Sequence, residues 1–182
     1  MSEGAAEEHS SDQRTRYISI GVAVFLIALV ALLAFSGGGG GENDRNRLLG
    51  KRVPEISGPT LAGGTYDIDA ARGRWVLVNF FATWCGPCIA EHPELVELEA
   101  WGVENGQLEL VSVVFDDDPQ NVADLFAELG GSWPVLDAPR TVVEFQIRQV
   151  PESFLVNPDG VVVAQFISGV EAERVIAEMG TS

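Results

Sequence analysis

Hydrophobic residues first gather near the N-terminus, where residues 17–35 (YISIGVAVFLIALVALLAF) carry no charge. A helix of this length spans about 28 Å and can cross the hydrocarbon core of a bilayer, which is about 30 Å thick. The run is longer than the roughly 7–15 apolar residues of a secretory signal peptide. Cleavage after Ala34-Phe35-Ser36 is the competing interpretation. We predict that residues 17–35 form a retained transmembrane anchor.

Basic residues set the expected orientation of this anchor. Arg14 and Arg16 directly precede it and favour a cytoplasmic N-terminus. Four basic residues between positions 45 and 52, on the other side of the anchor, favour the opposite orientation. They belong to the start of a large domain, however, and large domains cross membranes largely regardless of charge. We therefore expect a single-pass protein of the cell membrane with its domain outside the cytoplasm. The chain then divides into a cytoplasmic tail (1–16), the transmembrane anchor (17–35), a flexible glycine-rich linker (36–52) and a folded domain (53–182).

Beyond the linker, short apolar runs alternate with amphipathic stretches and with glycine or proline turns. Residues 75–81 (WVLVNFF) are apolar almost throughout, which is typical of a central strand buried on both faces. Gly63-Gly64 and Asn157–Gly160 predict hairpin turns. The predicted strands are 55–61, 65–68, 75–81, 108–115, 135–136, 153–156 and 161–166, and the predicted helices are 85–101, 118–129, 141–145 and 171–179. This order predicts an α/β fold with a central mixed sheet flanked by helices.

The charge of the chain narrows its range of partners. The net charge is −16, from 27 acidic and 11 basic residues. Such a surface repels phosphate backbones, so we expect no nucleic-acid partner, and the charge serves solubility. Asp116-Asp117-Asp118 is interpreted as a loop followed by a helix N-cap at Asp118, and a cation site there is the weaker alternative.

The two cysteines, Cys85 and Cys88, carry the candidate chemistry. They lie in FFATWCGPC, where the first follows the buried strand and the second lies one turn into a helix. Backbone N–H groups and the helix dipole then favour a thiolate at Cys85, the form that attacks disulfides, while Cys88 resolves the mixed intermediate. Gly86 keeps the turn open to a partner, and Pro87 stands where helices accept proline.

Two structural alternatives to redox chemistry remain for this pair. A zinc site needs two further ligands, and the chain offers only His9 and His92, with His9 on the other side of the predicted anchor. A purely structural disulfide over so short a loop restrains little unfolded-chain entropy. We therefore expect neither a metal nor another cofactor.

Two separated motifs connect the domain to a known family. FFATWCGPC is followed by Glu91-His92-Pro93, and residues 150–156 read VPESFLV. With these motifs the chain resembles the thioredoxin superfamily, and more closely its membrane-anchored, extracytoplasmic ResA, TlpA and CcmG (DsbE-type) branch. The resemblance implies a thioredoxin-like fold with an N-terminal hairpin and a central helical insertion at 118–129.

The resemblance also implies roles for individual residues. Pro151 matches the family's cis-proline beside the cysteines, where the backbone of Val150 would pair with an extended substrate chain; a proline that only starts a strand is the alternative. Trp84 is expected to flank the cysteine pair at the surface. Glu91 matches an acidic residue near the cysteines and could shuttle the proton of Cys88 if it is partly buried, whereas an exposed helical glutamate is the other interpretation.

Asn79 and His92 are two further residues expected near the cysteines or on the same helix. Asn79 stands where thioredoxin has a buried aspartate, and because asparagine cannot transfer a proton, that duty would pass to Glu91 or to water. His92 is expected at the helix surface, with a contact to the site as the alternative.

As an activity, the resemblance implies a protein disulfide reductase. A membrane electron donor of the DsbD or CcdA type would re-reduce the cysteines, and apocytochrome c is the candidate substrate. The Gly-Pro pair between the cysteines matches thioredoxin, a reductant near −270 mV, and not the oxidant DsbA near −120 mV. A haem-maturation scaffold without turnover is one alternative. A thiol peroxidase is another, although Val78 and Ala82 replace the proline and hydroxyl residue of such enzymes.

Overall fold

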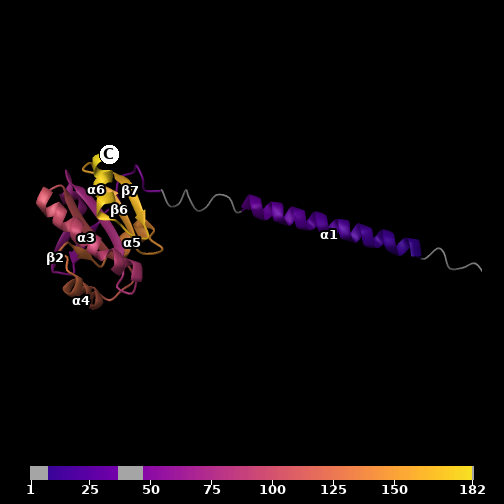
Figure 1. The fold of residues 1–182 in the computed structure, drawn as a ribbon, viewed down its shortest axis with the longest axis horizontal. Helices are drawn as coiled ribbons and strands as arrows, with labels where there is room; N and C mark the ends of the chain where they lie inside the picture. The colour runs from indigo at the N-terminus through magenta and orange to yellow at the C-terminus, as the bar shows by residue number, and fades with distance from the viewer. Residues whose placement is uncertain (1–7, 37–46, 182) are drawn as a thin grey trace, which may run out of the picture. The chain divides into compact units, whose positions relative to one another are not determined.

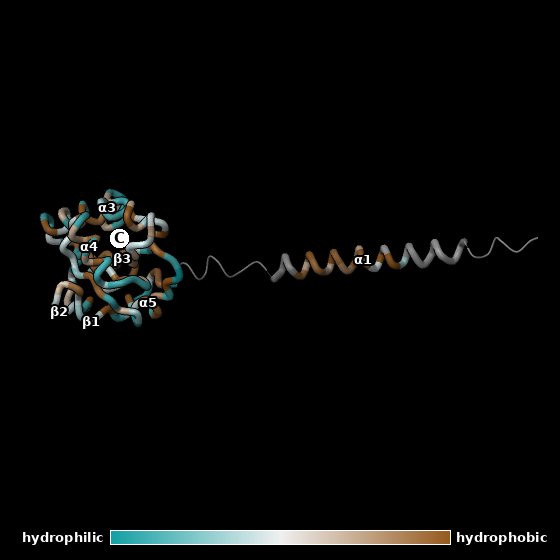
Figure 2. Tube along the Cα trace, turned by 90° about the horizontal axis from the view of Figure 1, so that it is seen from below, coloured by the Kyte–Doolittle hydropathy of each residue, from teal (hydrophilic) through white to brown (hydrophobic). Residues whose placement is uncertain are grey.

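The computed structural model describes residues 8–36 and 47–181, and the chain divides into two units, with the boundary in sequence between Arg47 and Leu48. The first unit holds one helix, α1 (Glu8–Ser36). Figure 2 shows hydrophobic colours along the middle of this helix, and the large apolar side chains from Tyr17 to Leu32 are exposed. Residues 1–7 and 37–46, which include parts of the predicted tail and linker, lie outside the described residues.

The predicted transmembrane helix is not confirmed. Within residues 8–36 and 47–181, no helix was found that combines the length and the apolar character needed to cross a membrane. The anchor at 17–35 therefore stays a prediction from the sequence.

The second unit is built on one mixed sheet in the order β2-β1-β5-β4-β3-β6-β7. Figure 1 shows β2 on one side of this unit and β6 and β7 on the other. Strand β3 pairs in parallel with β4, which pairs in parallel with β5, and the other pairs are antiparallel. The strands are β1 (Ser57–Thr60), β2 (Gly64–Asp67), β3 (Trp75–Phe81), β4 (Leu108–Val114), β5 (Val135–Leu136), β6 (Glu152–Val156) and β7 (Val162–Ile167). Each predicted strand is confirmed, as is the mixed α/β architecture.

Helices cover both faces of this sheet. One buried cluster joins α3, α4 and α6 to the sheet, and a second joins α5 and the 3-10 helix η1 to its other face. The elements are η1 (Ile68–Ala71), α3 (Gly86–Asn105), α4 (Pro119–Leu129), α5 (Pro139–Phe145) and α6 (Ala172–Thr181). Helix α3 runs past its predicted end at 101, because Gly106 in the left-handed conformation caps it (φ 65°).

The alternation of side chains along β3 prepares the functional site. Leu77 and Phe81 belong to the cluster beneath α3, whereas Val76 and Val78 belong to the cluster on the other face. By the two-residue period of a strand, Asn79 faces α3 as well. Its register partners are Ser112 on β4 and Ser153 on β6. A row of three polar residues therefore crosses the centre of an apolar sheet below the active-site helix.

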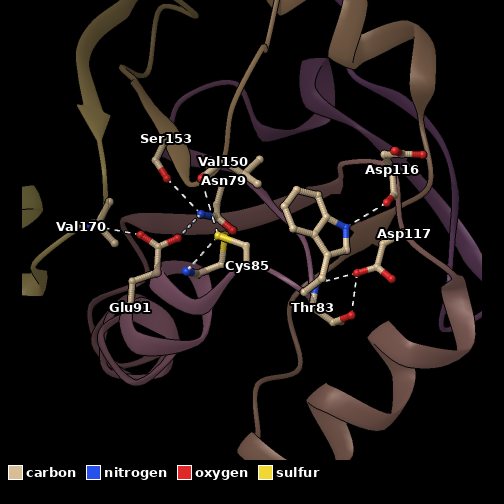
Figure 3. Close-up of a disulfide and its surroundings, with 11 residues drawn as sticks. Asn79, Thr83, Cys85, Glu91, Asp116, Asp117, Val150, Ser153 and Val170 are labelled. Atoms are coloured by element: carbon tan, nitrogen blue, oxygen red, sulfur yellow. Dashed lines mark hydrogen bonds between the residues drawn. A yellow bond between two sulfur atoms is a disulfide. The ribbon is translucent and has the colours of Figure 1, made fainter.

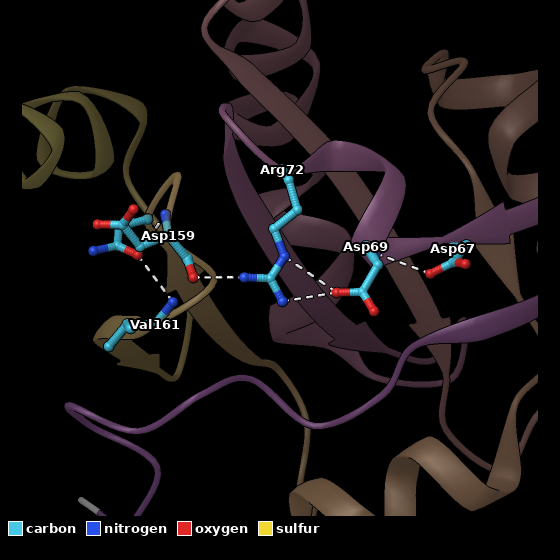
Figure 4. A network of polar contacts seen from close by, with 6 residues as sticks. Asp67, Asp69, Arg72, Asp159 and Val161 are labelled. Atoms are coloured by element: carbon cyan, nitrogen blue, oxygen red, sulfur yellow. Dashed lines mark hydrogen bonds and ion pairs between the residues drawn. The ribbon is translucent and has the colours of Figure 1, made fainter.

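A polar contact ties η1 to the hairpin between β6 and β7 (Figure 4). Arg72 donates from Nη1 to the backbone oxygen of Asp159 at 2.6 Å, and its Nη2 contacts Asp69 Oδ1 at 2.7 Å. The Asn157 side chain closes the turn by accepting from the N–H of Val161 at 2.9 Å. The predicted hairpin is confirmed, and Arg72 connects it to a segment more than eighty positions earlier.

Candidate active site

Cys85 is the N-cap of α3, and this places its sulfur against the start of the helix (Figure 3). Its backbone is extended (φ −89°, ψ 104°), and the N–H of Cys88 donates to Cys85 Sγ at 3.2 Å. The two sulfurs are joined in a disulfide, and both residues are buried. Gly86 and Pro87, between them, are exposed. The pair is thus in its oxidised form, at a helix terminus whose N–H groups stabilise negative charge on sulfur when the bond is opened.

A second segment reaches Cys85 from the far end of the domain. The peptide bond between Val150 and Pro151 is cis, as the resemblance implied. The backbone oxygen of Val150 lies 3.5 Å from Cys85 Sγ. Strand β6 begins directly after this bond and pairs with β3, which leads to the cysteines. Because β3 and β6 are adjacent and antiparallel, the cysteines and the Val150 carbonyl lie at the same end of this strand pair.

The acidic loop after β4 holds the residues that precede Cys85. Thr83 donates from both its backbone N–H and its hydroxyl to Asp117 Oδ2, the latter at 2.6 Å. Trp84 is 61% exposed, and its Nε1 donates to the backbone oxygen of Asp116 at 3.0 Å. Burial raises the pKa of Asp117, but the hydrogen bonds from Thr83 and neighbouring groups outweigh it and lower this pKa.

The contact between Thr83 and Asp117 was not predicted from the sequence. Asp118 was predicted to cap a helix, which is confirmed because Asp118 Oδ1 accepts from the N–H of Gln120 at 2.7 Å. Asp117 and Thr83 lie 34 positions apart, and no local pattern marks them as partners. Only the parallel pairing of β3 with β4 brings their loops together.

Glu91 is buried on the α3 face that looks onto the sheet, with 5% of its surface exposed. Its Oε1 accepts from Asn79 Nδ2 at 2.9 Å, and its Oε2 accepts from the N–H of Val170 at 3.0 Å (Figure 3). Burial raises its pKa, and the two hydrogen bonds oppose that shift. The alternative of an exposed helical glutamate is therefore wrong. A carboxyl group with a raised pKa one helical turn beyond Cys88 is suited to accept a proton there.

His92 differs from its expected place at the helix surface. It is 3% exposed, its Nε2 lies 2.8 Å from the backbone oxygen of Gly130, and its ring packs against Phe126 and Trp133. The surface interpretation is wrong because α4 and the segment after it cover this part of α3. The partners of His92 are thus an aromatic cluster and a backbone carbonyl.

Across residues 8–36 and 47–181, no group of three or more His, Cys, Asp or Glu side chains is arranged to hold a metal ion. The reactive groups that the structure brings together are the cysteine pair, the buried Glu91 and the Val150 carbonyl. A dithiol that closes to a disulfide releases two electrons, and this pair is placed to exchange them with another disulfide.

Comparison with known proteins agrees with this chemistry. The family model described as Redoxin matches residues 48–179, which is most of the chain. The chain belongs to the Redoxin family. It is 32% identical over 146 residues to the thiol:disulfide interchange protein HelX of Rhodobacter capsulatus, covering 75% of this chain and 80% of HelX. It is also 29% identical over 159 residues to the thiol:disulfide interchange protein DsbE of Escherichia coli, covering 82% of this chain and 83% of DsbE.

Solved structures agree with the fold of this Redoxin protein. A thiol:disulfide interchange protein of the thioredoxin family from Chlorobium tepidum superposes with a TM-score of 0.65 at 25% identity, over 71% of this chain and 94% of that one. The thioredoxin-like fold is thereby confirmed. Because the protein carries a Cys-x-x-Cys pair and its relatives are thiol–disulfide oxidoreductases, it is a thiol–disulfide oxidoreductase.

Proposed function

We propose that the protein reduces disulfide bonds in other proteins outside the cytoplasm. The observation that carries this proposal is the position of Cys85 Sγ, which accepts from the Cys88 N–H at a helix terminus and lies 3.5 Å from the Val150 carbonyl. The first contact favours a thiolate, and the second places an extended backbone beside it for a substrate chain to align against. The exposed residues Trp84, Gly86 and Pro87 border the same sulfur and form the rest of the substrate-binding surface.

The reaction begins with both cysteines reduced. The Cys85 thiolate attacks one sulfur of a substrate disulfide, a bond forms between them, and the other substrate sulfur leaves as a thiolate and takes up a proton. Cys88 then gives its proton to the Glu91 carboxylate and attacks Cys85 Sγ. The second substrate sulfur leaves and takes up a proton in turn, so that two electrons have passed to the substrate. The protein finishes with the Cys85–Cys88 disulfide present in the structure.

The wider setting of this reaction comes from the resemblance to the ResA, TlpA and CcmG branch. Disulfide-bonded apocytochrome c is the proposed substrate, because its Cys-x-x-Cys-His thiols must be free before haem is attached. A membrane dithiol donor of the DsbD or CcdA type would supply the two electrons that reopen Cys85–Cys88. A peroxidase is disfavoured, because the fully buried Val78 and Ala82 occupy the positions where such enzymes carry proline and a hydroxyl residue.

We further propose that residues 17–35 anchor the protein in the cell membrane. Support comes from the length of the uncharged run and from the exposed apolar side chains of α1 between Tyr17 and Leu32, since a segment with apolar side chains on every face favours an apolar surrounding. Membrane fractions washed with alkaline carbonate should retain the full chain, and external protease should digest its domain in spheroplasts. Release into the wash, or protection from protease, would refute the anchor or its orientation.

The direction of the reaction is tested by the reduction potential of the full chain, equilibrated with glutathione or dithiothreitol buffers. We expect a value nearer to thioredoxin, about −270 mV, than to DsbA, about −120 mV. A reduction potential close to that of DsbA would show that the protein forms disulfides in its substrates instead of reducing them.

The substrate is tested by trapping. Cys88→Ser leaves Cys85 unable to be released from a mixed disulfide, so adducts should accumulate and be identifiable by mass spectrometry. Cys85→Ser is the matched control, because it keeps one thiol but removes the attacking one, and it should trap little. Full support of cytochrome c maturation by Cys85→Ser would instead identify a scaffold that needs no turnover.

A further inference from the structure

A chain of buried hydrogen bonds runs across the sheet and ends on Glu91. Trp133 Nε1 donates to Ser112 Oγ at 2.8 Å, and Ser112 Oγ donates to Asn79 Oδ1 at 3.2 Å. Asn79 Nδ2 then donates to Glu91 Oε1 at 2.9 Å and to Ser153 Oγ at 3.0 Å. All five side chains are buried, so water does not compete for these groups. These hydrogen bonds connect the segment before β5, together with strands β4, β3 and β6, to the active-site helix α3.

The groups at the two ends, Trp133 and Glu91, together fix the donor-to-acceptor direction of these hydrogen bonds. An indole N–H can only donate, so Ser112 Oγ must accept from Trp133. The hydroxyl proton of Ser112 is then free for Asn79, whose carbonyl oxygen accepts it. The amide group of Asn79 is thereby turned with its N–H atoms toward Glu91 and Ser153. In the opposite orientation, Asn79 Oδ1 would face a carboxylate oxygen, a contact that only a protonated Glu91 could satisfy.

We propose that Trp133 and Ser112 are positioning residues for the active site: they orient the Asn79 amide so that it donates to Glu91 and keeps the carboxylate available as a proton acceptor. This inference rests on the proposed role of Glu91 in accepting the proton of Cys88. The hydrogen bonds of Trp133 and Ser112 lead to Asn79, and through it to Glu91, so both residues act through the Asn79 amide.

The effect on Glu91 has a definite sign. Burial raises its pKa, and the N–H groups of Asn79 and Val170 oppose that shift. Loss of the ordered amide removes one of these donors, so the pKa rises further and less carboxylate is present at neutral pH. The hydrogen bond from Asn79 therefore keeps more of this buried acid in its carboxylate form at neutral pH.

Each of the other titratable side chains near Glu91 has a partner of its own in the structure. Cys85 and Cys88, at the start of the same helix, are bonded to each other. His92 is directed to the backbone oxygen of Gly130, and Glu94 accepts from the N–H of Ala172 at 2.9 Å. From β3 and from the segment before α6, the groups that contact Glu91 are neutral amides. The oxidised protein thus offers a titration of Glu91 without a titrating thiol beside it.

The experiment follows the Glu91 carboxyl by ¹³C NMR over pH in the oxidised full chain, with Ser112→Ala, Trp133→Phe and the double variant. Complete loss of a hydrogen bond to a charged group corresponds to about one to two pH units. Ser112→Ala loosens the Asn79 amide without removing it, so it should raise the midpoint by up to about one unit. Trp133→Phe keeps most of the ring packing and should raise it by less. The double variant should match Ser112→Ala, because the two residues act in series. Trp101→Phe, a substitution of a half-buried tryptophan packed against the same core, is the control and should leave the midpoint unchanged.

An unchanged Glu91 midpoint in folded Trp133→Phe and Ser112→Ala would overturn the inference, as would shifts that add in the double variant. If Ser112→Ala does not fold, Trp133→Phe alone decides. The pH profile of substitution into a disulfide substrate should move in the same direction as the NMR midpoint. Because the NMR titration needs no turnover, a protein that fails to reduce disulfides but shows the shift would refute the proposed function and leave the hydrogen-bond chain standing.

Discussion

The backbone oxygen of Val150 lies 3.5 Å from Cys85 Sγ, although 65 positions separate the two residues. The contact exists because β6 pairs antiparallel with β3, so that β6 begins beside the end of β3 from which the chain leads into α3. It gives the reactive sulfur a backbone neighbour beside which an extended substrate can lie. The chemistry of the cysteine pair is therefore local in sequence, but its substrate surface is assembled from both halves of the domain.

The first prediction concerns ionisation of Cys85. In the reduced Cys88→Ser variant the N–H of residue 88 still points at Cys85 Sγ, so this thiol should ionise below the pH of about 8.5 that is typical of free cysteine. The measurement is the rate of alkylation by iodoacetamide as a function of pH. Cys85→Ser, which leaves the buried Cys88, is the control and should react slowly throughout. An alkylation midpoint at or above that of free cysteine would remove the basis of the mechanism.

The second prediction concerns stability against pH. Burial raises the pKa of Glu91, so the folded state binds its proton more tightly than the unfolded state does. The stability associated with the bound proton is fully present below the unfolded pKa, and it is lost as the pH rises through the higher folded value. Urea denaturation of the oxidised chain should show this decline, and Glu91→Gln should show less of it.

Glu152 is the control for that measurement. Burial also raises its pKa, and the hydrogen bond from Gln165 opposes that shift without cancelling it, so Glu152 contributes a decline of the same sign. Glu152→Gln should remove this second part and leave that of Glu91. An unfolding free energy of Glu91→Gln that falls with pH as steeply as in the unmodified chain would contradict the assignment to Glu91.

The third prediction concerns the loop that holds Trp84. Asp117→Asn weakens acceptance of the two hydrogen bonds from Thr83, so the segment before Cys85 should open more readily. Hydrogen exchange at the Thr83 amide should accelerate by up to about tenfold, because a hydrogen bond to a charged group is worth about 1.5–3 kcal/mol and exposure of Asp117 reduces that value. Asp116→Asn is the matched control, since Trp84 donates to the backbone oxygen of residue 116, which this substitution leaves in place. Equal exchange rates in the two variants would show that the Asp117 side chain does not hold this loop.

The fourth prediction separates close packing from helix propensity. A methyl group at Gly102 in α3 would lie 2.5 Å from the backbone oxygen of Leu108, whereas one at Gly180 in α6 would have nothing within 4 Å. Gly102→Ala should therefore destabilise the fold by about 1–3 kcal/mol despite the better helix former. Gly180→Ala should be neutral or stabilising by up to about 1 kcal/mol. Urea denaturation distinguishes the two, and equal effects would exclude the close approach of α3 to β4.

Features that depend on neighbouring positions could be predicted from the sequence alone. The apolar run 75–81 indicated the central strand, Asn157–Gly160 indicated a hairpin, and the spacing of Cys85 and Cys88 indicated a redox pair at a helix start. Each signal lies within a few residues, because turn chemistry, strand period and helix capping are local properties. The cis bond at Pro151 was expected only through the resemblance, since a valine-proline pair does not itself specify the isomer.

Tertiary structure alone decided the environments of the polar side chains. The sequence placed Glu91 and His92 on α3 but did not specify which faces α4 and the sheet would cover, so one was left open and the other was wrongly expected at the surface. The hydrogen bonds from Thr83 to Asp117 and from Trp133 through Ser112 to Asn79 depend on the register of β4 beside β3. Burial and hydrogen-bond partners arise from contacts between distant segments, and a local pattern does not encode which segments will meet.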